Sequence, residues 1–340
     1  MRSATRARPP QMTLRLDQNW LWDFWHIWHG EECHLFFLQS PRSLGSERLR
    51  HHNASIGHAV SRDLRHWTVV RDALHPGPEG EWDDLATWTG SVIADSGLWR
   101  MFYTGVKRSE RGLIQRIGIA TSSDLYHWKK DPANPILQAD PRWYEVLDLK
   151  SWYEQAWRDP WVFRDSTDGR FHALVTARDR SGDPDSRGVI GHACSWNLRD
   201  WEVLPPRSKP TDFGQLELPQ LVCKANRFFL LFSCDRKDYA RSRVARIADR
   251  PKTGTFYLAA DNPLGPFETS DANLLFGDAS GSYYGGKLIE DPSGQFHFLA
   301  FKQFGPDGDF VGELSEPFPV TFDDEHKPHV EFPSVEDPPV

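Results

Sequence analysis

Short apolar stretches alternate with polar turns along most of this chain, and no long stretch shows the periodicity of an amphipathic helix. The apolar stretches are rich in β-branched and aromatic residues, and Gly, Pro, Asp and Asn separate them, which is typical of an all-β protein. The clearest predicted strands are residues 34–39, 98–103, 171–176, 228–233 and 296–301.

A sequence repeat organises these strands. Its copies are residues 58–67, 119–128 and 192–201, each with small residues, a Ser, a polar turn, a Leu and a Trp, and residues 258–267 form a looser copy. Four-stranded units repeated around an axis form a β-propeller. We therefore expect residues 16–320 to form one domain, a five-bladed β-propeller, in which the repeat tryptophans Trp67, Trp128 and Trp201 pack the blades.

The two ends of the chain differ from this pattern. Residues 1–15 are basic and polar without the apolar core of a secretory signal, and we expect a disordered or extended N-terminal lead. Residues 321–340 are rich in Pro, Asp, Glu and His, and we expect a C-terminal tail. No apolar run approaches the roughly 20 residues that a membrane span requires, so we expect a cytoplasmic protein without membrane contact.

Composition narrows the classes of partner. With 40 Lys and Arg against 48 Asp and Glu, the net charge is −8, which argues against nucleic acid because phosphate binding requires a basic surface. The 15 Trp, 21 Phe and 8 Tyr mostly pack the core, but such rings also stack on sugars. No residue group suggests a cofactor or a catalytic metal, and the sequence leaves the oligomeric state open. The cysteines lack C-x-x-C spacing and are expected to be buried thiols: Cys33, Cys194, Cys223 and Cys234.

Three carboxylic acids lie in unusual surroundings. Asp23 is set among aromatic side chains in residues 20–25, Asp159 lies between Arg158 and a Pro-Trp pair, and Glu217 lies between two leucines. The repeat places these acids in the first, third and fourth blades, whose innermost strands line the central channel. We expect the three carboxyl groups to meet at one end of that channel, although each acid taken alone also fits a structural turn.

Paired carboxyl groups in different environments can cleave a glycosidic bond. The leucines beside Glu217 should remove water from it and keep it protonated, which suits a general acid/base. Asp23 must instead be ionised, and Arg158 is its expected cation partner. Asp159, beside the same arginine, is then expected to bind sugar hydroxyls.

Six motifs follow one another in an order that resembles the five-bladed furanosidases of glycoside hydrolase families 32 and 68, which include invertases, fructanases and levansucrases. Families of this kind carry a W-M-N-D-P-N-G type opening, H-L-F-Y-Q, G-H-A-x-S-x-D-L-x-x-W, W-S-G-S, R-D-P and E-C-P. The matching segments are Trp20-Leu-Trp-Asp23 with His34-Leu-Phe-Phe-Leu-Gln39, residues 57–67, Trp88-Thr-Gly-Ser91, Arg158-Asp-Pro160 and Glu217-Leu-Pro219.

The resemblance implies a retaining reaction through a covalent fructosyl-enzyme, without a metal ion. Asp23 would be the nucleophile, Glu217 the acid/base, and Asp159 would bind sugar hydroxyls and stabilise the transition state. The substrate would be a β-fructofuranoside, as an oligosaccharide or a small glycoside, with hydrolysis or transfer to another sugar as the outcome. The side chains expected to bind it are Arg158, Gln39, Trp88, Ser91 and Trp22.

The chain also departs from the family pattern. Trp22 replaces an Asn, Phe24-Trp25 replaces Pro-Asn, and Leu218 replaces a Cys, so polar contacts to the sugar are lost and bulk is added. We expect no C-terminal β-sandwich of the kind that family 32 enzymes usually carry. Two alternatives remain: an inverting arabinofuranosidase or xylosidase similar to family 43, which also uses two Asp and one Glu, and a non-catalytic sugar-binding propeller.

Overall fold

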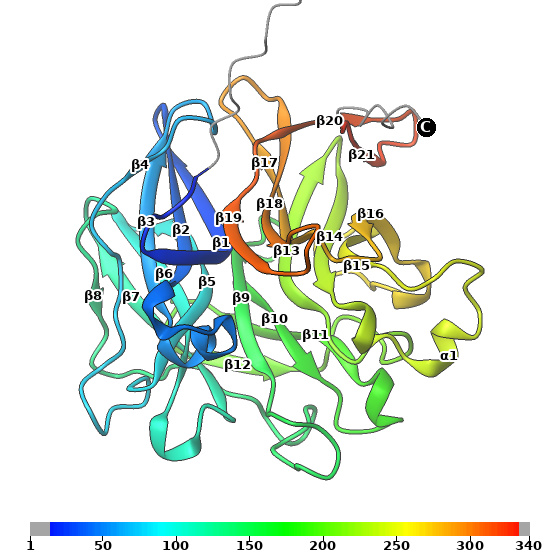
Figure 1. Cartoon of the computed structure of the whole chain (residues 1–340). Helices are drawn as coiled ribbons and strands as arrows, with labels where there is room; N and C mark the ends of the chain where they lie inside the picture. Colours follow the sequence, from blue (N-terminus) through cyan, green and yellow to red (C-terminus); the bar gives the residue numbers. More distant parts are fainter. Residues whose placement is uncertain (1–13, 333–340) are drawn as a thin grey trace, which may run out of the picture.

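The computed structural model describes residues 14–332, and over this range the strands form five antiparallel sheets arranged as the blades of a propeller (Figure 1). The strands of each blade are consecutive in sequence, and the first strand of each is the innermost, because β1, β5, β9, β13 and β17 contact one another around the axis. The predicted five-bladed all-β propeller is therefore confirmed.

The elements are as follows. Blade 1 contains β1 (Asn19–His29), β2 (Glu32–Pro41), β3 (Ser55–Ser61) and β4 (Thr68–Val69); blade 2 contains β5 (Ala86–Asp95), β6 (Leu98–Val106), β7 (Gln115–Ser122) and β8 (Lys129–Lys130). Blade 3 contains β9 (Trp157–Arg164), β10 (Phe171–Arg178), β11 (Gly188–Ser195) and β12 (Trp201–Leu204); blade 4 contains β13 (Glu217–Lys224), β14 (Arg227–Cys234), β15 (Thr253–Ala260) and β16 (Asn273–Asp278). Blade 5 contains β17 (Tyr283–Glu290), β18 (Phe296–Phe304), β19 (Phe310–Leu314), β20 (Phe318–Phe322) and β21 (Pro328–Val330). Short helices occupy connections: η1 (Arg42–Leu44), η2 (Glu47–Asn53), η3 (Arg108–Glu110), η4 (Pro184–Ser186), η5 (Arg236–Asp238), α1 (Arg241–Val244) and η6 (Thr269–Asp271).

The sequence repeat forms the turn that follows the third strand of a blade. In blade 1 the Oγ of Ser61 accepts the N–H of Asp63 at 3.2 Å, and the Asp63 carboxylate accepts the N–H groups of Arg65 and His66 at 2.9 and 2.8 Å. Leu64 between them is buried and has a φ of 60°. The same side-chain bonds to the backbone recur at Ser122 with Asp124 and at Ser195 with Asn197.

The repeat tryptophans join neighbouring blades. Trp128 of blade 2 meets Phe36 of blade 1 edge-on at 5.6 Å, and Trp201 of blade 3 meets Phe102 of blade 2 in the same way at 5.6 Å. Trp67 packs on the core that blade 1 shares with its neighbours. The apolar cores therefore lie between adjacent sheets, as blade stacking requires, and the blade-packing role expected for these residues is confirmed.

The C-terminal segment corrects one expected boundary. β20 and β21 pair with each other and extend blade 5 to Val330, so residue 320 lies inside a strand and not at the start of a tail. Phe332 stacks on Phe276 of blade 4 at 3.9 Å, which attaches this end to the neighbouring blade. The turn-rich sequence gave no sign of the two short strands β20 and β21. Residues 1–13 of the expected lead and 333–340 of the expected tail lie outside the described range.

Cys223 is exposed, whereas the other three cysteines are buried as expected. In the part of the chain that the structure describes, no helix is long and apolar enough to cross a membrane.

Stacked histidine pairs recur in blades 1 and 3, on the second and third strands. His34 Nδ1 lies 3.0 Å from His58 Nε2, and His172 Nδ1 lies 2.9 Å from His192 Nε2. Burial, together with the neighbouring His34, lowers the pKa of His58 to about 3. Burial, with Arg207 nearby, lowers the pKa of His192 to about 2. These imidazoles are therefore neutral at pH 7.

The buried histidine pairs should make the fold less stable at acidic pH. A group whose pKa is lower in the folded state contributes stability above its ordinary pKa, here 6.5, and loses it as the pH falls toward the folded value. At pH 5 each such histidine should lower the free energy of unfolding by up to about 2 kcal/mol. We expect Tm to fall between pH 7 and 5, and His58→Gln to show a smaller fall over that interval despite a lower Tm at pH 7. Equal falls in the two proteins would contradict this origin.

Candidate active site

The innermost strand of every blade is interrupted at one end of the channel. The pairing register shifts at Trp22/Phe24 in β1, at Trp88/Gly90 in β5, opposite Leu174/Thr176 in β9, at Glu217/Gln220 in β13 and at Tyr284/Lys287 in β17. A β-bulge of this kind redirects a side chain next to an active site. The left-handed residues at these bulges are Asp23, Asp159, Leu218 and Gly285, with φ values of 34°, 56°, 58° and 64°.

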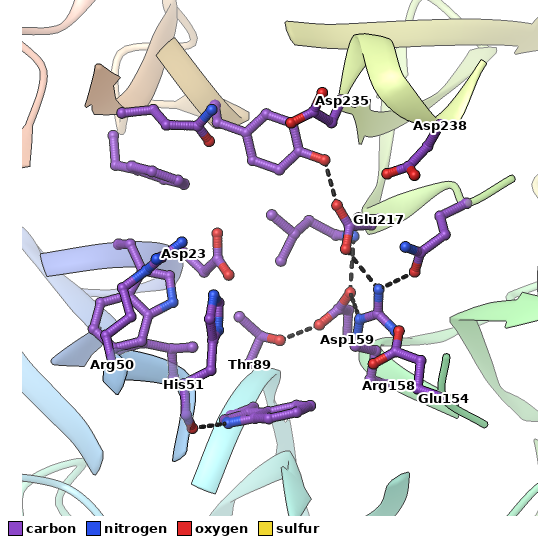
Figure 2. Close-up of a pocket in the computed structure, with 18 of the residues that line it drawn as sticks. Asp23, Arg50, His51, Thr89, Glu154, Arg158, Asp159, Glu217, Asp235 and Asp238 are labelled. Carbon is purple, nitrogen blue, oxygen red and sulfur yellow. Dashed lines mark hydrogen bonds and ion pairs between the residues drawn. The ribbon is translucent and has the colours of Figure 1, made fainter. Parts of the chain in front are cut away.

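The bulges surround a cavity of about 420 Å³ at the end of the channel. Asp23, Asp159 and Glu217 all line it, and Figure 2 shows the three carboxyl groups directed into it from three different blades. The sequence-based expectation that these acids meet is therefore confirmed by their positions. Other lining residues come from the connections between strands, including Arg50, His51, Tyr153, Glu154, Gln215, Asp235 and Asp238.

Asp159 is held by a dense set of donors. Its carboxylate accepts the hydroxyl of Thr89, the hydroxyl of Thr176 at 2.8 Å and the N–H of Leu218 at 3.1 Å, and Arg158 Nε lies 3.5 Å away. A carboxylate has about four acceptor positions. Most of those on Asp159 are already used by the protein, so its position is fixed before any ligand binds.

Arg158 connects the acids on one side of the cavity. Its guanidinium pairs with Glu217 at 2.6 Å and with Glu154 at 2.7 Å, and it also donates to Gln215. The second oxygen of Glu217 accepts the hydroxyl of Tyr284. The carboxylate of Glu217 thus has a cation and a hydroxyl donor, not the apolar surroundings that its leucine neighbours suggested, because the bulge turns it into the cavity.

Asp23 lies on the opposite side and does not have the expected partner. Burial, followed by the negative charges of Asp159 and Glu217, raises the pKa of Asp23 to about 8, whereas the positive charges of Arg50 and Lys287 act in the opposite direction. Arg158 was expected to be the cation beside Asp23, and this was wrong, because Arg158 is occupied by the acids across the cavity. Figure 2 shows Arg50 of η2 on the Asp23 side.

Lys287 is a buried cation beside the site that sequence reasoning missed. Its Nζ donates to the carbonyl of Leu218 at 2.6 Å, and the N–H of Leu218 donates to Asp159. Lys287 thereby holds the left-handed residue that follows Glu217 in the chain. Burial lowers the pKa of Lys287 to about 8, and the charges of Asp159 and Asp23 oppose that change.

Removing this charge should shift the pH dependence of the reaction. In Lys287→Met, Asp23 loses a compensating positive charge, so its pKa should rise further. We expect the acidic limb of kcat/KM to move about one unit to higher pH and activity at pH 7 to fall about tenfold. A pH–rate profile tests this, with Lys302→Met, a lysine outside the cavity, as the control. An unchanged limb in Lys287→Met would contradict the role.

Three of the five expected substrate-binding side chains line the cavity: Trp22, Trp88 and Arg158. Gln39 does not, because Leu38 faces Trp22 in the β1–β2 pairing and lines the cavity instead. The extra leucine in His34-Leu-Phe-Phe-Leu-Gln39 moves the glutamine by one position, which turns it to the other face of the strand. Gln39 is bonded there to Asp72 at 2.7 Å and Asn19 at 2.9 Å.

Ser91 also lies outside the lining of the cavity. Its Oγ accepts the N–H of Val162 in blade 3 at 3.0 Å, between two blades. Thr89, two positions earlier and within the bulge of β5, lines the cavity in its place. Gly90 between them cannot be replaced by a larger residue, because a Cβ there would lie 1.8 Å from the carbonyl oxygen of Phe102.

The connection between β2 and β3 supplies a wall that the motifs did not indicate. Trp88 Nε1 donates to the carbonyl of His51 at 2.7 Å, which fixes η2 against blade 2. The Arg50 guanidinium lies 5.5 Å from the ring of Trp22 and 4.3 Å from that of Phe310. The basic residues Arg48, Arg50, His51 and His52 beside a predicted channel were the available signal.

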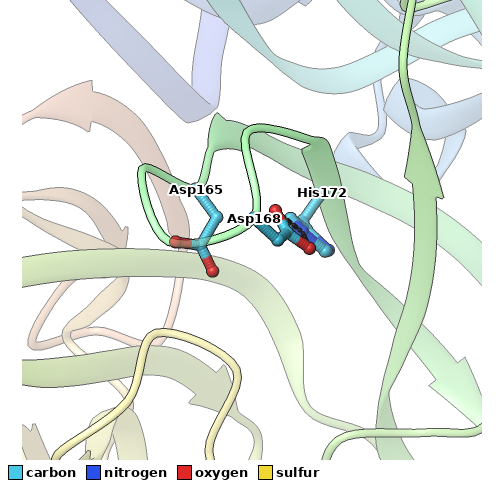
Figure 3. A group of neighbouring side chains, drawn as sticks. All are labelled: Asp165, Asp168 and His172. Atoms are coloured by element: carbon cyan, nitrogen blue, oxygen red, sulfur yellow. Dashed lines mark hydrogen bonds and ion pairs between the residues drawn. The ribbon is translucent and has the colours of Figure 1, made fainter.

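One group elsewhere has the spacing of metal ligands. Asp165, Asp168 and His172 lie at the turn between β9 and β10, with potential ligand atoms within 4.8 Å of one another (Figure 3). Asp168 already pairs with Arg170 at 2.9 Å and with His172 at 3.2 Å. The ion pair of Asp168 with Arg170 and its hydrogen bond with His172 therefore account for the closeness of Asp168 and His172.

A five-bladed propeller with acids from three innermost strands in one channel-mouth cavity has the architecture of a propeller glycosidase. The chain matches the family description "Glycosyl hydrolases family 32 N-terminal domain" over residues 16–301. It belongs to glycosyl hydrolases family 32, as the resemblance of its motifs predicted, and the alternatives similar to family 43 or without catalysis are not favoured.

Individual relatives agree with this assignment. The chain is 29% identical over 196 residues to the cell wall isozyme of β-fructofuranosidase from Pisum sativum, and 33% identical over 269 residues to a levanase from Bacillus sp. (strain L7). These matches cover 56% and 72% of this chain but 32% and 26% of the relatives, so the chain spans about a third or less of their length. An inulosucrase from Halalkalicoccus jeotgali, solved with kestose, has the same fold, with a TM-score of 0.75, 20% identity and coverage of 95% and 92% of the two chains.

Proposed function

We propose that this protein is a retaining glycosidase that cleaves β-D-fructofuranosides and passes the fructosyl group to water or to another sugar. The observation that carries the proposal is the placement of Asp23 and Glu217 on opposite walls of one cavity, in a chain of family 32. The names of the relatives, β-fructofuranosidase and levanase, support the choice of sugar.

The reaction would proceed in two steps. Ionised Asp23 attacks the anomeric carbon of the fructosyl unit, the glycosidic C–O bond breaks, and Glu217 donates a proton to the leaving oxygen. Glu217 then removes a proton from water or an acceptor hydroxyl, which attacks the same carbon and releases Asp23. Each step inverts the anomeric centre, so the overall reaction retains its configuration.

The protein's own contacts divide the roles. Arg158 and Tyr284 hold both oxygens of Glu217, and Asp159 is fixed by Thr89, Thr176 and Leu218 close to the reacting centre. Hydrogen bonds made before substrate arrives reduce the reorganisation needed in the transition state. Asp159 is left with little free acceptor capacity, which suits one bond to a sugar hydroxyl rather than several.

A substrate screen tests the proposal. Sucrose, 1-kestose, inulin, levan and an aryl α-L-arabinofuranoside would be incubated with the protein, and NMR would record the first-formed anomer. We expect cleavage of fructofuranosides with retention. Cleavage of the arabinofuranoside alone, or an inverted first product, would overturn the assignment.

A further inference from the structure

We propose, on the basis of the function above, that Tyr153 is a stacking platform for the leaving-group sugar and that it makes the enzyme prefer substrates whose leaving group is a sugar ring. Tyr153 lines the cavity, yet 52% of its surface is exposed. A large aromatic side chain at the rim of a glycosidase cavity offers an apolar face of the kind that sugar rings stack on.

The side chain of Tyr153 is held in place by its neighbours. Its ring stacks on Trp152, with centroids 5.0 Å apart and planes at 29°, and its hydroxyl accepts a hydrogen bond from the side-chain amide of Gln215. Stacking covers one face of the ring, and the phenol bond fixes its direction. Since the ring is already immobilised, binding a sugar there would cost little side-chain entropy.

A buried arginine supports the platform from beneath. The Arg178 guanidinium lies 3.7 Å from the ring centroid of Trp152, and Arg178 is 1% exposed. It donates to Glu145 at 2.6 Å and to the carbonyl of Gly214 at 2.6 Å. Blade 3 and the segment that precedes β13 therefore anchor the loop that carries Trp152 and Tyr153.

The position of Tyr153 identifies which sugar it would contact. Gln215, which donates to Tyr153, also accepts from Arg158, and Arg158 pairs with Glu217. Tyr153 thus lies on the Glu217 side of the cavity. Glu217 donates its proton to the leaving oxygen in the proposed reaction, so the leaving sugar, or an acceptor sugar in the reverse step, lies on that side.

The test compares leaving groups with and without a ring. We expect Tyr153→Ala to lower kcat/KM for sucrose and 1-kestose about tenfold, and to leave kcat/KM for methyl β-D-fructofuranoside within about twofold, since stacking contributes on the order of one factor of ten. Tyr153→Phe, which keeps the ring, should retain most of the activity on sucrose. Trp196→Ala, which removes an aromatic side chain 71% exposed and outside the cavity, is the matched control.

Binding provides a second arm that does not depend on turnover. In an Asp23→Asn background, calorimetry with sucrose should give a Kd about tenfold weaker when Tyr153→Ala is added. Equal losses of kcat/KM on sucrose and on the methyl fructoside, or an unchanged Kd for sucrose, would overturn the proposal that Tyr153 stacks on the leaving sugar. A wild-type protein inactive on all three fructosides would overturn the proposed function, and the binding arm would then still decide the platform.

Discussion

Asp23→Asn should abolish turnover and raise thermal stability. The amide cannot attack the anomeric carbon, so kcat should fall about 10⁴-fold or more. The same change removes a carboxylate that burial and two neighbouring acids disfavour, because these raise its pKa from 3.8 to about 8. Stabilising substitutions that destroy activity are typical of strained catalytic groups.

The sign of the stability effect follows from linkage. An acid whose pKa is raised by folding contributes stability below its ordinary pKa, here 3.8, and that contribution is lost as the pH rises to about 8. At pH 8 the substitution should therefore stabilise the fold by about 1–3 kcal/mol, a value reduced to allow for partial hydration of Asp23. Thermal unfolding at pH 4 and 8 tests this, with Asp261→Asn on the surface as the control. A lower Tm for Asp23→Asn than for the wild type at pH 8 would contradict the inference that ionised Asp23 destabilises the fold.

Glu217→Gln should lower kcat on sucrose about 10²–10⁴-fold, since general acid/base catalysis contributes effects of that size. The loss in the first step should be smaller for an aryl fructoside, whose leaving group needs less protonation. Azide should restore part of the rate with that substrate, because it needs no general base. Steady-state kinetics with both substrates would measure these effects.

Glu154→Gln is the matched control for that prediction. Glu154 and Glu217 pair with the same guanidinium of Arg158, at 2.7 and 2.6 Å. If the loss in Glu217→Gln came only from leaving the positive charge of Arg158 without one of its carboxylate partners, the two variants would lose activity equally. We expect Glu154→Gln to lose about tenfold at most, and comparable losses in the two variants would remove Glu217 from the acid/base role.

The sequence predicted the architecture because the fold is a repeat. The Ser of each turn, and the Asp or Asn two residues later, make local bonds to the backbone that the sequence specifies directly, and the spacing of the three copies gave the size of a blade. Once the blades were counted, Asp23, Asp159 and Glu217 could be placed on innermost strands. The two strands after residue 317 were missed because their short, proline-containing segments carry no repeat.

The details of the site were harder to predict because they depend on the bulges. Neighbouring residues of a strand face opposite sides of the sheet, so the extra leucine before Gln39 puts Leu38 on the cavity side and Gln39 on the other side. Pro160 and Pro219 were a usable signal, since a proline has no N–H to give to the ladder and tolerates a bulge. The positive charges of Arg50 and Lys287, which lower the pKa of Asp23, come from other parts of the chain, and no local pattern indicates them.

In the proposed reaction Asp23 carries the fructosyl group while Glu217 transfers the proton. Incubating Glu217→Gln with an aryl β-D-fructofuranoside should allow the first step and slow the second, so that the intermediate accumulates. Mass spectrometry of the peptides should then find one fructosyl group on the peptide that contains Asp23. Turnover of that substrate with no labelled peptide, or with the label on a different residue, would contradict the account.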